Sequence, residues 1–157
     1  MTQHQFEKNL EKLGITLPVP VAPVANYVTF VQTGNLLSIS GQLPLDLDGK
    51  LPYQGKVGAD VTPEDAAKAA RLCAINIISQ INKACGGDLS RVVRIVKLGA
   101  FVNCVDGFAA QPAVVNGASD LMVDVFGDVG KHSRSAVGTN ALPLNVPVEI
   151  DALVEIS

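Results

Sequence analysis

The chain lacks tryptophan, and aromatic residues make up only 4% of its 157 residues. Surfaces that stack single-stranded bases are built from aromatic side chains, so none is expected here. Basic residues are also scarce, because 12 lysines and arginines stand against 15 acidic residues, which gives a net charge of −3. Nucleic-acid binding needs a basic surface, and we therefore expect no nucleic-acid partner.

Cysteine and histidine are few as well. The three cysteines form no CxxC pair, and the two histidines, His4 and His132, are far apart in the sequence. This pattern predicts no metal site and favours a reducing, cytoplasmic location over a secreted fold held by disulfides. The N-terminus is polar, and no apolar run approaches the roughly 18 residues of a membrane span, so no membrane segment is expected.

Charge is low for a protein that stands alone in water. Charged residues make up 17% of the chain and hydrophobic residues 48%, whereas about 25% charged is typical. A chain with too few charges to coat its surface is expected to bury part of that surface in an oligomer. The length predicts a single domain over residues 1–157, with an extended, proline-containing N-terminal segment over residues 1–26.

Hydrophobic periodicity predicts an α+β fold of the order β-β-α-β-α-β-β, in which two helices pack on one face of a mixed sheet. A short helix over residues 4–13 precedes it. The clearest helix begins after Thr62, a good N-cap that is followed by Pro63 and two acidic residues, and ends at Gly86. A second helix ends at Gly127. The other expected elements are a hairpin (27–32 and 36–40), a central strand that is apolar on both faces (91–103), and two C-terminal strands (133–142 and 146–157).

The last strand alternates between an apolar side and a side that carries Glu149 and Asp151. We expect the sheet face without helices to carry mixed residues of the last two strands, including Arg134 and Glu149. Because the chain has so little charge, this face is expected to pack against other subunits rather than against water.

Several spaced blocks resemble the RidA/YjgF family of reactive-intermediate deaminases, over about residues 27–156. They are SISGQLPLD (38–46), KLGAFVN (97–103), VVNGASDLMVDVFG (114–127) and RSAVGTNALPLNVPVEIDALVEI (134–156). The resemblance implies a chorismate-mutase-like homotrimer with three clefts between subunits. It also implies hydrolysis of carboxylate-bearing enamines and imines, of the 2-aminoacrylate type, to 2-keto acids and ammonia without a metal or an organic cofactor.

Carried over by position, Arg134 resembles the arginine that binds the substrate carboxylate, and Glu149 resembles the acid that orients or activates water. A planar guanidinium suits bidentate carboxylate binding, and one carboxyl group that cycles its proton can serve both protonation and water attack. The resemblance also implies four further substrate-binding positions, namely Tyr27, Gly41, Asn116 and the backbone at Ala136.

The same residues have ordinary structural explanations. Arg134 alone fits an interface ion pair, Glu149 a solvated strand residue, and Gly41 a bend in a strand. An acid–base role for His132 is less favoured. At the level of the whole protein, the alternatives to an enzyme are a trimer that only binds small carboxylates and, less favoured because of the pI of about 5.2, a ribonuclease. The presence of both Arg134 and Glu149 favours the enzyme, because binding alone would not need the acid.

The chain also departs from the family pattern. Ala136 stands where many members have cysteine, and Ala25-Asn26 stand before Tyr27 in place of Gly-Pro. Residues 114–131 look several residues longer than usual. These differences concern the wall of the expected cleft, and they leave the physiological amine open.

Overall fold

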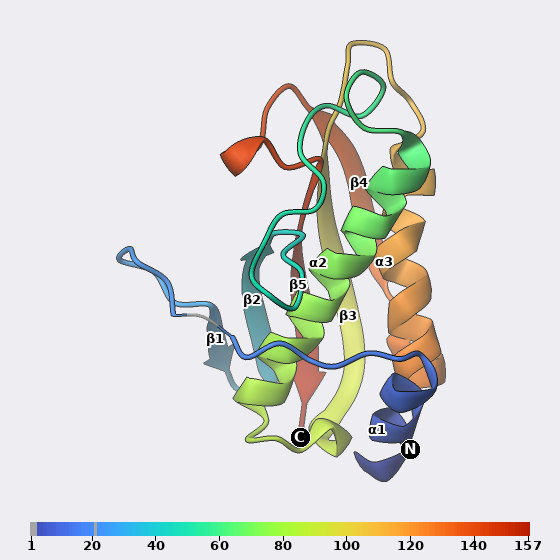
Figure 1. Cartoon of the computed structure of the whole chain (residues 1–157). Helices are drawn as coiled ribbons and strands as arrows, with labels where there is room; N and C mark the ends of the chain where they lie inside the picture. The colour runs from blue at the N-terminus through green and yellow to red at the C-terminus, as the bar shows by residue number, and fades with distance from the viewer. Residues whose placement is uncertain (1–2, 21) are drawn as a thin grey trace.

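The computed structural model describes residues 3–20 and 22–157 as a five-stranded sheet with two long helices on one face (Figure 1). The sheet order is β1-β2-β5-β3-β4, with β3 and β4 parallel and the other pairs antiparallel. This confirms the expected α+β order, preceded by a short helix. The elements are α1 (Gln3–Lys12), β1 (Phe30–Thr33), β2 (Leu36–Gln42), α2 (Pro63–Ala84), η1 (Leu89–Arg91), β3 (Val92–Asn103), α3 (Gln111–Phe126), η2 (Gly127–Gly130), β4 (Ser133–Thr139), η3 (Pro143–Asn145) and β5 (Val148–Ile156).

Local signals fix the ends of α2. The Thr62 hydroxyl accepts a hydrogen bond from the backbone N–H of Asp65 at 3.1 Å, which satisfies one of the free amides of the first turn. After the helix, Gly86 and Gly87 adopt left-handed φ angles of 65° and 88°, which side chains disfavour. The predicted start and end of this helix are therefore confirmed.

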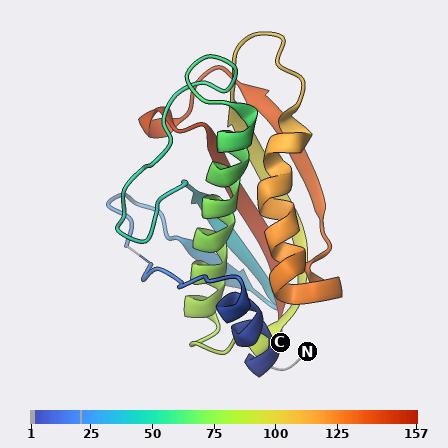
Figure 2. The same ribbon diagram turned by 45° about the vertical axis from the view of Figure 1, so that its right-hand side comes forward.

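The helices α2 and α3 lie side by side across the sheet (Figure 2). They approach closely at Gly117, where a β-carbon would lie only 2.0 Å from the backbone oxygen of Ala67. No side chain fits in that space. The absence of a side chain at Gly117 therefore allows α3 to pack closely on α2.

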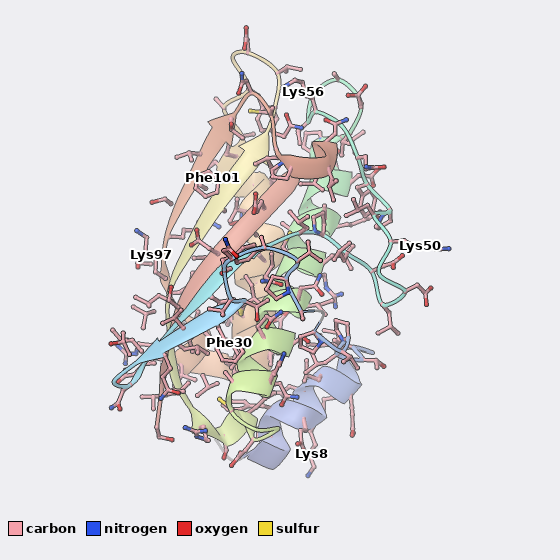
Figure 3. All side chains as sticks on the ribbon, turned by 90° about the vertical axis from the view of Figure 1, so that its left-hand side faces the viewer. Lys8, Phe30, Lys50, Lys56, Lys97 and Phe101 are labelled. Carbon is pink, nitrogen blue, oxygen red and sulfur yellow. The ribbon has the colours of Figure 1, made fainter. Side chains whose placement is uncertain are left out.

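Only one face of the sheet is covered. Ile150, Ala152 and Val154 of β5 point to the helices and are buried, together with their neighbours on β3. On the other face Phe101 of β3 is 41% exposed and Val137 of β4 is 47% exposed, and Figure 3 shows Phe101 on the side away from α2. The expectation that residues 91–103 form a central strand is confirmed, but in this chain that strand is buried on one face only.

The N-terminal segment is tied to the helical layer. The rings of Phe6 in α1 and Phe126 in α3 meet edge to face, with centroids 5.0 Å apart, and the Asn9 amide donates to the backbone oxygen of Val125 at 2.8 Å. Further along, the Ser79 hydroxyl donates to the Pro18 carbonyl at 2.5 Å, which holds the segment against α2. This segment crosses α2 in Figure 1 and leads to β1.

Three further observations on the described residues concern membrane spans, metal sites and cysteines. Between residues 3 and 157, residue 21 aside, no helix combines the length and apolar character needed to cross a bilayer. The same residues contain no group of three or more His, Cys, Asp or Glu side chains arranged to hold a metal ion. The three cysteines are buried free thiols, and Cys73 lies in the core as expected.

Replacing Gly117 with alanine should destabilise the protein, although alanine is normally the better helix residue by about 0.5–1 kcal/mol. The added methyl group would clash with the Ala67 carbonyl, and such overpacking costs about 1–3 kcal/mol. Chemical denaturation measures the change. The control is Asp124→Ala on the exposed side of α3, which should change the stability by less than about 0.5 kcal/mol. Wild-type stability in Gly117→Ala would show that the two helices separate without cost.

Candidate functional site

The six residues singled out in the sequence fall into two groups in the structure. Tyr27, Gly41 and Glu149 gather around β2 and β5, and we call them the glutamate group. The arginine group consists of Asn116, Arg134 and Ala136, which belong to α3 and β4. β3 lies between Glu149 on β5 and the arginine group on β4, and Gly41 on β2 is one strand further away, so one chain does not bring the two groups together.

Arg134 lies on the helix side of the sheet, where it contacts α3. Its register partner on β3 is Leu98, a buried core residue, so both side chains point toward the helices. One guanidinium nitrogen, Nη1, donates to Asn116 Oδ1 at 2.9 Å and to Ser119 Oγ at 3.0 Å. The other, Nη2, donates to the backbone oxygen of Pro112 at 3.4 Å. The expectation that Arg134 shares the open face with Glu149 is therefore wrong.

The cause is the register of β4 at the edge of the sheet. Strand residues alternate between the two faces, and Ala136 follows Arg134 on the helix side while Val137 turns to the open side. Polar Arg134 thus faces the helices and apolar Val137 faces outward, which is the reverse of the usual pattern. At this edge the arginine reaches the rim of α3 rather than the core, so its head group stays partly exposed.

Glu149 lies on the open face, directly beside Gly41. A β-carbon built at Gly41 would lie 2.4 Å from Glu149 Oε1, so the carboxyl group occupies the space that a side chain would need. The pairing of β2 with β5 also shifts between Ile39 and Gln42, as at a β-bulge. Both interpretations of Gly41 therefore fit the structure. The strand is irregular at this residue, and the missing side chain makes room for the Glu149 carboxyl group.

Tyr27 lies before β1 rather than inside it, because the strand begins only at Phe30. The residue is 57% exposed. Together with Gly41 it lines a hollow of about 500 Å³ between the N-terminal segment and the end of β2. The glutamate group thus consists of an acid, a glycine that makes room for it, and an exposed tyrosine that lines the same hollow as the glycine.

Burial raises the pKa of the Glu149 carboxyl group above its ordinary value, and the neighbouring Asp151 carboxylate raises it further. Asp151 also has a raised pKa because of burial, although the backbone N–H of Gly99 and the charge of Lys97 act in the opposite direction. Near neutral pH, Glu149 therefore holds a proton more often than an exposed glutamate does. A carboxyl group with this property can donate a proton and take it back.

Ser119 contacts Arg134 but was not singled out in the sequence. It lies three residues after Asn116 on α3, a spacing that places two side chains on the same face of a helix. That spacing is the signal that could have pointed to Ser119, provided that the helix face opposite Arg134 was known.

Comparison with known proteins establishes the family. Residues 7–156 match the family described as "YjgF/chorismate mutase-like, putative endoribonuclease", and the chain belongs to it. The relative "Protein TCP17" of Trypanosoma cruzi is 49% identical over 95% of this chain and 92% of its own length. A crystal structure of a protein of unknown function from Agrobacterium tumefaciens is 48% identical, with a TM-score of 0.92 over 99% of this chain and 96% of that one.

Two more distant members carry informative names. A "2-iminobutanoate/2-iminopropanoate deaminase" from Dermatophagoides farinae is 28% identical over 90% of this chain and 94% of its own. The crystal structure of E. coli TdcF with bound serine is 25% identical, with a TM-score of 0.64 over 91% of this chain and 97% of that one. The family thus includes an imine deaminase and a protein crystallised with a small amino acid.

Replacing Glu149 with glutamine should stabilise the protein at neutral pH. Below the ordinary glutamate pKa of about 4.3 the carboxyl group is protonated in both the folded and the unfolded chain, so the substitution removes no penalty. As the pH rises from the unfolded pKa to the raised pKa of the folded state, wild-type stability falls, because the folded chain must then carry a poorly hydrated charge. Thermal unfolding should therefore show a gain in Tm that is larger at about pH 8 than at about pH 4.

Glu11→Gln on α1 is the control, because this glutamate is exposed and its replacement should shift Tm by a similar amount at both pH values. A gain for Glu149→Gln that shrinks as the pH rises would contradict the predicted effect of burial.

Proposed function

We propose that this protein hydrolyses reactive 2-imino acids and their enamine tautomers to 2-keto acids and ammonia. The proposal is supported by family membership, by the deaminase name of one relative, and by an arginine and a carboxyl group of raised pKa at positions that resemble the family pattern. No metal or organic cofactor takes part in the proposed reaction.

The observation that carries the proposal is the separation of the arginine group from the glutamate group. Arg134 lies at the β4 edge on the helix side, and Glu149 lies near β2 on the open side. A carboxylate-bearing substrate of a few atoms cannot reach both within one chain. We therefore place the active site in a cleft between two chains, where the arginine group of one subunit faces the glutamate group of the next, in a homotrimer.

The reaction needs one proton donor and one water molecule. The protonated Glu149 carboxyl group delivers its proton to the terminal carbon of the enamine, which becomes an iminium ion. The resulting carboxylate takes a proton from the water that attacks the iminium carbon. Glu149 then passes that proton to the amino group. As ammonia leaves and the carbonyl forms, the Glu149 carboxylate takes the remaining proton of the hydroxyl group. The sum is enamine plus water to keto acid plus ammonia, and Glu149 ends protonated as it began.

Arg134 binds the substrate carboxylate in this scheme. Its guanidinium offers two parallel N–H groups that match the two carboxylate oxygens, and its positive charge favours the anion. Gly41 leaves room for the acid beside the reacting carbon, and the Tyr27 ring borders the hollow that takes the rest of the substrate. Asn116 supports Arg134 through its side-chain oxygen. The backbone at Ala136 is proposed as a water contact.

A carboxylate-binding trimer without turnover is the second candidate, favoured by the serine found bound to TdcF. It would use the arginine group alone. The raised pKa of Glu149 favours the enzyme, because binding of an anion is not helped by a second carboxyl group next to the site. The net charge of −3 counts against RNA as the substrate.

Replacing Glu149 with glutamine should separate binding from catalysis. Glutamine keeps the size and hydrogen-bonding ability of the side chain but transfers no proton, so turnover should fall roughly 10²–10⁴-fold. The measurement generates 2-aminoacrylate enzymatically and follows its decay with and without the protein. Binding of 2-ketobutyrate, measured by calorimetry, should persist in the variant.

The matched control is Asp151→Asn, because Asp151 lies on the same strand face and also has a raised pKa. This variant should keep most of the activity. If Asp151→Asn is the damaging change, the acid has been assigned to the wrong residue. If the wild type accelerates the decay of no enamine, the carboxylate-binding trimer becomes the better explanation.

Two inactive variants should restore each other's activity when their subunits are mixed. A cleft that takes its arginine from a Glu149→Gln chain and its acid from an Arg134→Ala chain contains both native groups. Random mixing gives one half times one half, or about a quarter, of the clefts in this state. Co-refolding the two variants and assaying enamine decay tests the arrangement.

The control is the mixture of the same two purified proteins without unfolding, in which subunits have not been exchanged. Light scattering of the wild type should give about three times the chain mass of 16.4 kDa. A site contained in one chain predicts no recovery after mixing, and a monomeric wild type would remove the intersubunit cleft altogether.

A further inference from the structure

A chain of hydrogen bonds continues from Arg134 beyond the residues that a substrate would touch. Arg134 Nη1 lies 3.0 Å from Ser119 Oγ, and Ser119 Oγ lies 2.9 Å from His132 Nε2. The other ring nitrogen, His132 Nδ1, lies 2.7 Å from the backbone oxygen of Gly130. Ser119 belongs to α3, whereas His132 lies between η2 and β4, so the chain joins the helix to the start of the strand that carries the arginine.

The direction of each bond follows from what each group can do. A guanidinium only donates, so Ser119 Oγ accepts from Arg134. The Gly130 carbonyl only accepts, so His132 Nδ1 carries a hydrogen. In the neutral imidazole Nε2 is then an acceptor, and it takes the single hydroxyl hydrogen of Ser119. His132 thereby orients the Ser119 hydroxyl so that its oxygen lone pairs face Arg134.

This arrangement determines which edge of the guanidinium remains available. Both hydrogens of Nη1 are used, one by Asn116 Oδ1 and one by Ser119 Oγ. Nη2 gives one hydrogen to Pro112 O. With respect to the described residues, this leaves the Nε hydrogen and one Nη2 hydrogen for a ligand, and Nε and Nη2 share one edge of the planar group. That edge matches the two oxygens of a carboxylate.

We propose that Ser119 and His132 are positioning residues, which hold the Arg134 guanidinium so that its Nε–Nη2 edge is presented to the substrate carboxylate. The inference rests on the proposed role of Arg134 in carboxylate binding and adds two residues to it. Arg134 has many rotamers, and a group held by several acceptors loses less freedom when the ligand arrives. The three acceptors on α3 fix one end of the guanidinium, and the histidine fixes the orientation of one of those acceptors.

The test removes each bond and then restores it. Ser119→Ala and His132→Leu should each weaken 2-ketobutyrate binding roughly three- to tenfold, the usual effect of one lost hydrogen bond. Ser119→Thr keeps the hydroxyl, and His132→Gln keeps an acceptor, so both should bind nearly as tightly as the wild type. Binding of 2-oxobutanamide, which lacks the carboxylate, should change little in any variant. In enamine decay, Ser119→Ala should raise KM and leave kcat nearly unchanged.

A double variant shows whether Ser119 acts through Arg134. In an Arg134→Ala background, Ser119→Ala should leave the residual kcat/KM of enamine decay unchanged, because the group that it positions is gone. An equal loss in both backgrounds would show a general effect on α3 and overturn the inference. Wild-type affinity in Ser119→Ala, together with lost binding in Arg134→Ala, would overturn it while leaving the proposed function intact. Wild-type affinity in Arg134→Ala would instead overturn both.

Discussion

Helices cover only one face of the five-stranded sheet, and this constraint decides where each candidate site residue points. Strand residues alternate between faces, so the apolar residues of β5 at Val148, Ile150 and Ala152 must turn to the helices to be buried. Glu149, which lies between two of these buried residues, therefore points to the open face. On β4 the same alternation, fixed by pairing with the buried part of β3, sends Arg134 to the helix side. The arginine and the glutamate of the proposed reaction are thus placed on opposite faces by one requirement of packing.

Much of this fold follows from local signals that depend on few neighbours. The start of α2 depends only on the Thr62 hydroxyl and a nearby backbone amide. The strict alternation of β5 indicates directly which face of this strand is buried. The residues of both groups were also singled out in the sequence, five of them inside the family blocks and Tyr27 at the start of the resembling region. The order of the helices and strands, and the choice of candidate site residues, therefore come from the sequence alone.

The geometry of the site depends on contacts that the sequence does not display. The residues from Ser133 to Val137 mix small, charged and apolar side chains, so their pattern does not say which face is buried. That face is decided by the parallel pairing of β4 with β3, which are separated in the chain by all of α3. For the same reason the contact between Ser119 and Arg134 is invisible until α3 is placed. Tyr27 was expected inside a strand, but it precedes β1.

The open face carries exposed apolar side chains as well as the acidic Glu149, in a chain that has few charged residues. Phe101 and Val137 leave apolar surface there, which favours contact with a second copy of the chain over exposure to water. Contact of that kind would also deepen the burial of Glu149. Since burial is the main cause of its raised pKa, such association would raise that pKa further. The fold accepts a destabilising carboxyl group at this position, which is expected of a functional residue more than of a structural one.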